Sequence, residues 1–171
     1  MTPLVSNLWP QFMVDPAFAA CFGQVIVEHA QMLRQERQVI FTLRSGAPLD
    51  KNLCARLLAS LQPDYEGFEL RIQNLFGYAM LDEAALRDLM EEMKRDGVPI
   101  NGFLDRCKIN IIGQKITIGV CHGTKFLQEM HFEKLLAERI AAHTGVTPQV
   151  TLQSAVSEAE QHQMEEKLER K

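Results

Sequence analysis

The chain is 171 residues long, with 46% hydrophobic and 23% charged residues, which is the composition of a globular protein rather than of a disordered one. A chain of this length forms one ordinary domain or two small ones. Its net charge of −4 at pH 7 argues against a general phosphate-binding surface, because such surfaces are basic, and is compatible only with a local basic strip. No apolar run reaches the ~20 residues of a membrane span, and the N-terminus lacks a secretory signal. We therefore expect a cytoplasmic protein without a membrane partner.

The first part of the chain, residues 1–76, predicts an N-terminal arm followed by a hairpin, a helix and a strand. Apolar residues alternate in 24–33 and again in 38–44, on either side of a polar turn, which is the pattern of a β-hairpin. Asp50 then precedes a Leu-rich stretch as a helix cap, and this helix is expected to end at the next proline. A second alternating run, 68–72, closes the unit as a strand.

The second part, residues 77–153, predicts the same elements after an additional leading helix capped by Asp82. Apolar residues alternate over 108–120 around a Gly-Gln turn, so this segment is a second hairpin. One helix is expected over about 125–143, and a strand over 149–152. The side chains that this helix is expected to bury are Phe126, Met130, Leu135, Leu136 and Ile140.

The two parts contain the same unit twice. Residues 39–73 and residues 116–153 both run strand, glycine-containing turn, Leu-rich helix and strand, and each follows a further apolar strand. The sequence therefore predicts an α+β fold of two KH-like ββαβ units, 1–76 with its arm and 77–153 with its leading helix. A charged helical linker, 154–171, is expected to follow them.

Motifs that indicate catalysis or metal binding are absent from the sequence. No phosphate-binding, dinucleotide-binding, zinc-protease, nucleophile-elbow or calcium-loop pattern occurs. Cys121 and His122 are adjacent, so on a strand they point to opposite faces and make poor co-ligands. The four cysteines form no CxxC pair and are expected to be reduced thiols, with a disulfide between Cys107 and Cys121 as the alternative. We therefore expect a chain with no catalytic residues, no metal site and no cofactor.

Two sets of residues are candidates for binding. Val98, Ile100 and Phe103 lie among turn residues between the leading helix and the second hairpin, where an apolar surface patch would receive a protein partner. The alternative is that these three residues simply cap the core. For nucleic acid, the candidates are Lys108, Lys115 and Lys125, although the GxxG loop with which KH domains clamp the backbone is absent from the chain.

The order of these features resembles the N-terminal region of the PolC-type DNA polymerase III alpha subunit, a bacterial replicative polymerase. Residues 18–61, 81–104 and 107–145 carry the resemblance, which extends over nearly all of residues 8–153 as a match of pattern and element order. In that family two small domains precede an oligonucleotide-binding fold, a PHP domain, an inserted exonuclease and the polymerase core. Those small domains are similar to the last domain of the clamp-loader tau subunit and to the first domain of the initiator DnaA, which are truncated KH-like modules.

The resemblance implies a non-catalytic module that binds other replisome proteins. DNA-directed DNA synthesis and 3'–5' proofreading would belong to downstream domains of the parent, together with their Mg and Zn ions. One alternative is a KH-like module that binds single-stranded nucleic acid weakly. The other is a free-standing scaffold protein unrelated to replication.

Overall fold

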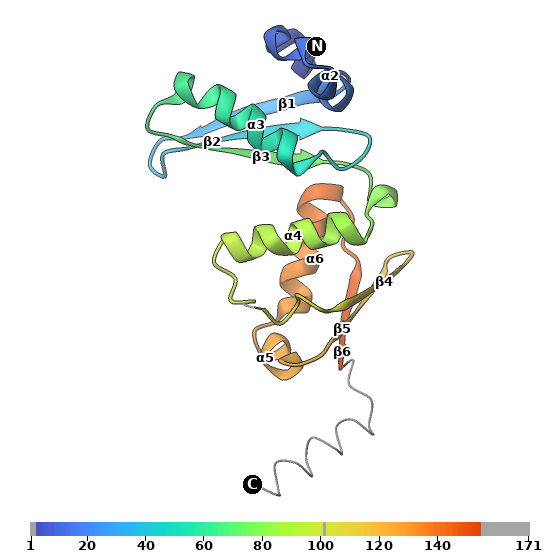
Figure 1. The fold of residues 1–171 in the computed structure, drawn as a ribbon. Helices are drawn as coiled ribbons and strands as arrows, with labels where there is room; N and C mark the ends of the chain where they lie inside the picture. Colours follow the sequence, from blue (N-terminus) through green and yellow to red (C-terminus); the bar gives the residue numbers. More distant parts are fainter. Residues whose placement is uncertain (1–2, 101, 155–171) are drawn as a thin grey trace, which may run out of the picture. The chain divides into compact units, whose positions relative to one another are not determined.

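The computed structural model describes residues 3–100 and 102–154, and their contacts divide into two units (Figure 1). The first unit runs to Leu81 and includes Ala142–Gly145, and the second comprises Asp82–Ala141 and the residues from Val146 onward. The helices and strands of the first unit are α1 (Val5–Leu8), η1 (Pro10–Val14), α2 (Pro16–Phe22), β1 (Ile26–Leu33), β2 (Gln38–Arg44), α3 (Lys51–Leu61), η2 (Gln62–Tyr65), β3 (Glu69–Leu75) and η3 (Tyr78–Met80). The helices and strands that follow along the chain are α4 (Glu83–Arg95), β4 (Lys108–Ile112), β5 (Lys115–Val120), α5 (Thr124–Glu129), α6 (Phe132–Thr144) and β6 (Gln149–Ser154).

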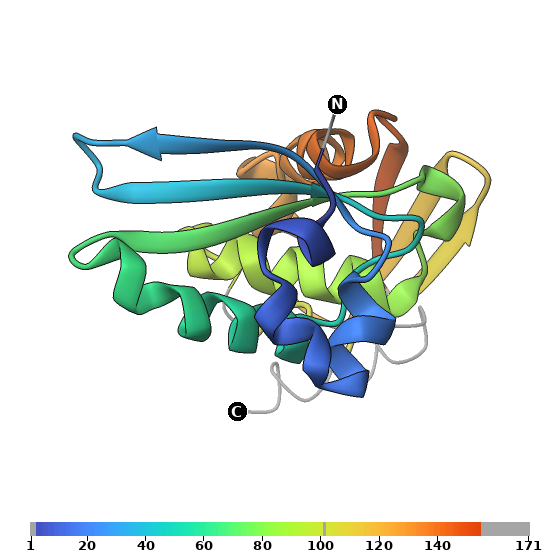
Figure 2. The ribbon, with the colours of Figure 1, turned by 90° about the horizontal axis from the view of Figure 1, so that it is seen from above.

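The first unit is a three-stranded mixed sheet covered on one side by helices. Its strand order is β1-β2-β3, with β1 antiparallel and β3 parallel to β2. Val39, Phe41 and Leu43 alternate along β2 and are buried against the apolar stripe of α3. The helices α1 and α2 lie on the same side of the sheet as α3, as Figure 2 shows. Asp50 caps α3 by accepting a hydrogen bond from the Leu53 amide at 3.0 Å, as the sequence predicted.

The second unit repeats this arrangement in the same chain order. Its sheet has the order β4-β5-β6, again with an antiparallel hairpin followed by a parallel third strand. Ile116, Ile118 and Val120 alternate along β5 and are completely buried. The predicted α+β class and the two separate small sheets are therefore confirmed.

The expected helix over 125–143 is wrong as a single element, because the chain breaks it into α5 and α6. His131 lies between the two helices in the left-handed region, with φ of 59°. A helix cannot continue through that conformation, which is uncommon for a residue with a side chain. Leu136 and Ile140 are buried on α6 as expected, whereas Phe126 on α5 is 42% exposed. Of the expected charged linker, 154–171, the first residue, Ser154, is instead the last residue of β6, and residues 155–171 lie outside the described residues.

Arg139 joins α4 to α6 within the second unit. Its Nη1 atom donates to Glu92 Oε1 and to Asp96 Oδ2, each at 2.8 Å, and the three side chains are only 24%, 32% and 23% exposed. Removing one partner of a partly buried ion pair costs more than removing one partner of an exposed pair.

We expect Arg139→Met to lower the free energy of unfolding by about 1–3 kcal/mol, since Glu92 and Asp96 then lose their shared donor. Urea unfolding followed by circular dichroism measures this. Arg44→Met is the control, because the ion pair of Arg44 with Glu28 is more exposed and is worth about 0–1 kcal/mol. Equal losses of stability in the two variants would contradict the larger contribution that we give to the ion pairs of Arg139.

Candidate protein-interaction site

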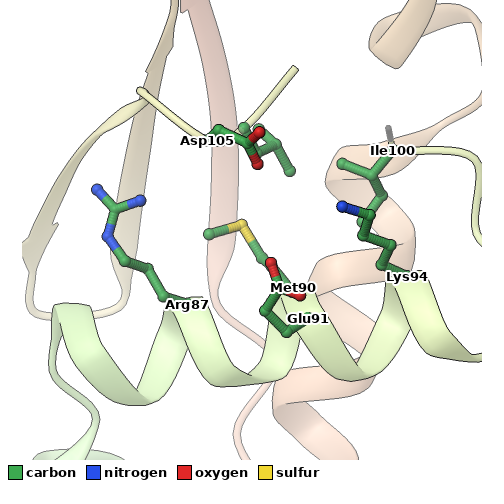
Figure 3. Close-up of a pocket in the computed structure, with 7 residues that line it drawn as sticks. Arg87, Met90, Glu91, Lys94, Ile100 and Asp105 are labelled. Atoms are coloured by element: carbon green, nitrogen blue, oxygen red, sulfur yellow. The ribbon is translucent and has the colours of Figure 1, made fainter. Parts of the chain in front are cut away.

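A groove lies along α4 in the second unit, between this helix and the segment that leads to β4 (Figure 3). Its volume is about 350 Å³, and its lining residues are Arg87, Met90, Glu91, Lys94, Ile100, Leu104 and Asp105. The four residues from α4, at positions 87, 90, 91 and 94, follow the i, i+3, i+4, i+7 spacing that places side chains on one face of a helix. We call this feature the α4 groove.

The floor of the α4 groove is apolar. Met90, Ile100 and Leu104 are 5%, 2% and 6% exposed, so they belong to the core and present only their outer atoms. The Val98 amide ties the segment to α4 by donating to the Met93 carbonyl at 3.1 Å. Within the segment the Ile100 amide donates to the Val98 carbonyl at 2.8 Å, and the Phe103 amide donates to the Ile100 carbonyl at 3.2 Å.

The rim of the α4 groove carries positively and negatively charged side chains. Arg87 donates to Glu83 Oε1 and to the Cys107 carbonyl, both at 2.8 Å, so it ties α4 to the residue before β4. The hydrogen bond that Arg87 donates to Glu83 raises the pKa of the Arg87 guanidinium, which stays charged. Glu91, Lys94 and Asp105 are exposed. In Figure 3 Glu91 and Lys94 project from α4 on the side of Asp105 and Ile100.

The structure separates the three apolar candidates, Val98, Ile100 and Phe103. Ile100 is buried in the groove floor, whereas Val98 and Phe103 are half-buried. Phe103 lies with His122 and Phe126, its ring centroid 5.5 Å from each of theirs. The three candidates therefore form no single exposed patch, and the groove beside them is lined mainly by α4.

Sequence reasoning missed Arg87, Glu91 and Lys94 as lining residues of the groove. Arg87 and Lys94 are seven positions apart on one helix, a spacing that places them on one face. That signal alone does not distinguish a groove rim from a solvated helix face, because the opposite wall comes from the segment before β4.

The basic candidates lie in two places. In the strand register Lys108 is opposite Gly119 and Lys115 is opposite Ile112, which puts both lysines on the outer face of the second sheet, near opposite ends. Four residues of strand separate those positions, about 13 Å. Lys125 lies in the first turn of α5, outside the sheet. The structure therefore brings Lys108 and Lys115 onto one face without Lys125.

All four cysteines are unpaired thiols, so the alternative disulfide between Cys107 and Cys121 is absent. Cys107 is buried and Cys121 is exposed. Burial, together with smaller contributions from the neighbouring Cys21 and Asp50, raises the pKa of the Cys54 thiol to about 12.

We expect Cys121 to react with iodoacetamide first at pH 8, and Cys54 to react roughly a hundredfold more slowly, because the thiolate is the nucleophile and a raised pKa keeps Cys54 protonated. Peptide mass spectrometry over a time course measures both rates. The difference should disappear in urea. Rapid alkylation of Cys54 in the folded chain would contradict its burial.

Within residues 3–100 and 102–154, no group of three or more His, Cys, Asp or Glu side chains is placed to hold a metal ion. Among the same residues, no helix is both long and apolar enough to cross a membrane. No protein-family model matches the chain, and searches of curated proteins and of solved structures gave no match.

Proposed function

We propose that this chain is a non-catalytic protein-interaction module of a bacterial replicative DNA polymerase of the PolC type. The observation that supports this most is the doubled ββαβ unit: both sheets have a hairpin followed by a helical connection and a parallel third strand. Such a doubled small domain is what the resemblance of residues 8–153 implies. KH-like architecture without a GxxG clamp favours protein binding over nucleic-acid binding.

In this assignment the chain contributes no catalytic residue and no cofactor. DNA-directed synthesis, proofreading and their metal ions belong to other parts of the parent protein, which acts in the cytoplasm. The partners of the chain are other replisome proteins.

The α4 groove is the docking site in this assignment, and its occupant is an amphipathic segment of another replisome protein. Met90, Ile100 and Leu104 provide an apolar floor for one inserted side chain. Glu91 and Lys94 on α4 and Asp105 on the opposite wall pair with opposite charges on that segment. Helix-lined grooves with an apolar floor and a charged rim are a common mode of peptide recognition.

The test is binding of the purified proteins of a bacterial replisome, each immobilised in turn, to the chain by biolayer interferometry. Lys94→Glu is expected to weaken the productive interaction about tenfold, since a like charge then faces the acidic side of the partner segment. Lys51→Glu is the matched control, an exposed lysine at the start of α3 in the first unit. Equal weakening by both variants, or no binding by any replisome protein, would contradict the docking site.

The second candidate function is binding of single-stranded nucleic acid by the outer face of the second sheet. Its residues by register are Lys108, Asn110, Ile112, Lys115, Thr117, Gly119, Gln149, Thr151 and Gln153. Two lysines and no carboxylate occupy this face, although the chain as a whole is acidic. An uncharged or basic sheet face tolerates phosphates, whereas acidic residues would repel them.

A further inference from the structure

The outer edge of β1 in the first unit is open along most of its length. Its start is paired: Leu4 bridges Ile26, and the Val27 amide donates to the Pro3 carbonyl at 2.8 Å. From Glu28 to Met32 the strand is exposed, and among the described residues no backbone hydrogen bond is made to its outer side. In Figure 2 the end of the β1–β2 hairpin that carries the turn points away from α1 and α2.

Two other sheet edges of the chain carry protection that β1 lacks. β4 is only five residues long and carries Lys108. The Leu152 amide of β6 donates to Glu133 Oε1 at 3.0 Å, so a carboxylate from α6 occupies that edge. Short strands, lysines and covering side chains prevent edge-to-edge pairing. β1 is eight residues long and contains neither lysine nor proline, and its irregularity is confined to the bulge between Val27 and His29.

The side chains of β1 are complementary to a second, antiparallel copy of themselves. With Gln31 opposite its own copy, Ala30 faces Met32, His29 faces Leu33, and Glu28 faces Arg34. Ala30 and Met32 lie on the helix-covered face of the sheet, opposite Phe41 and Val39 on β2. Met32 is 47% exposed there, so pairing with Ala30 of the copy covers an apolar side chain. In this register an apolar pair, Ala30 with Met32, lies beside a pair of opposite charges, Glu28 with Arg34 at the start of the turn after β1; both kinds of pair stabilise adjacent strands.

We propose that β1 pairs antiparallel with β1 of a second copy of this chain, with Gln31 on the twofold axis, and joins the two first-unit sheets into one continuous sheet. The charges support this occupant: Glu28, which pairs with Arg44 in its own chain, gains Arg34 of the copy, and this contact occurs twice by symmetry. Such pairing is independent of the α4 groove and of any role in replication.

Sedimentation equilibrium over a wide range of concentrations tests the pairing in the full chain. The mass is expected to rise from one chain to two. Met32→Lys is expected to raise the dimer dissociation constant by about tenfold or more. The variant places a charge against Ala30 of the copy, and a lysine on a strand edge opposes edge-to-edge pairing. Val14→Lys is the control, since Val14 is 85% exposed on η1 and should leave the dimer unchanged. Circular dichroism and the unfolding midpoint verify that both variants are folded.

Cross-linking tests the register separately. In a Cys121→Ser background, Gln31→Cys is expected to form an intermolecular disulfide when copper-phenanthroline and oxygen take two electrons and two protons from the paired thiols. Directly opposed strand residues have Cα atoms about 4.5–5.5 Å apart, within the range of a disulfide. His29→Cys should not cross-link to its own copy, because four residues of strand, about 13 Å, separate the two sites. A monomer at all concentrations, a dimer indifferent to a folded Met32→Lys variant, or cross-linking at 29 in place of 31 would each overturn the pairing.

Discussion

Replacing Ile100 by Asp is expected to lower the free energy of unfolding by at least about 4 kcal/mol, the largest single effect that we anticipate. Ile100 is 2% exposed in the floor of the α4 groove, so the variant loses its apolar contacts and buries a carboxylate without a partner. Urea unfolding followed by circular dichroism measures the loss.

Two controls separate charge burial from loss of packing at this site. Ile100→Val removes one methylene and should cost only about 0.5–1.5 kcal/mol. Val98→Asp, at the half-buried neighbour, should cost less than Ile100→Asp because its carboxylate can reach water. An Ile100→Asp variant as stable as Val98→Asp would show that Ile100 is a surface residue and that the groove floor is wrongly placed.

Gly123→Ala is expected to lower the free energy of unfolding by about 2–5 kcal/mol, for two reasons that can be separated. Gly123 has φ of +79°, where a side chain costs about 1–2 kcal/mol. A Cβ atom there would also lie 2.5 Å from Cδ1 of Phe103, so the ring must move, and overpacking of this kind costs about 1–3 kcal/mol. Thermal or urea unfolding gives the total.

Gly113→Ala is the matched control for the backbone cost, since Gly113 has φ of +56° and its added Cβ would meet no atom within 4 Å. In a Phe103→Ala background the clash disappears, so Gly123→Ala should then cost no more than Gly113→Ala. A cost that is unchanged by Phe103→Ala would mean that the ring of Phe103 does not pack on Gly123.

Local sequence signals predicted the parts of this fold that depend on periodicity and capping. Alternating apolar residues located both hairpins, and Asp50 and Asp82 cap α3 and α4 as expected, each accepting from an amide three residues later. The repeated hairpin–helix–strand order likewise predicted two small sheets where one large sheet was the competing arrangement.

The errors lie where tertiary contacts decide the outcome. No glycine or proline marks the break between α5 and α6, because His131 adopts the left-handed conformation itself. Phe126 was expected in the core on helical periodicity, but the break sets α5 apart as a short helix and Phe126 is 42% exposed beside Phe103. The burial of Ile100 depends on how its segment folds against α4, and periodicity carries no information about irregular segments.

The sequence predicted the region of the chain in which the α4 groove lies, but not the charged residues that line it. An apolar site at the junction of the leading helix and the second hairpin was expected from Val98, Ile100 and Phe103. Its charged rim comes from α4 and from Asp105, which the sequence brings together only after folding.

Salt dependence of binding tests the central claim, protein docking rather than phosphate binding, most directly. The chain is titrated, at several salt concentrations, into a fluorescent single-stranded oligonucleotide and, in parallel, into a fluorescently labelled sample of the replisome protein that it captures. Fluorescence anisotropy gives both affinities. We predict a protein affinity that weakens only modestly with salt and falls with Lys94→Glu, because the apolar floor carries most of the binding, and no oligonucleotide binding beyond the weak non-specific level. Oligonucleotide binding that weakens steeply with salt and is lost on replacing Lys108 and Lys115 by Glu, with no protein bound, would contradict it.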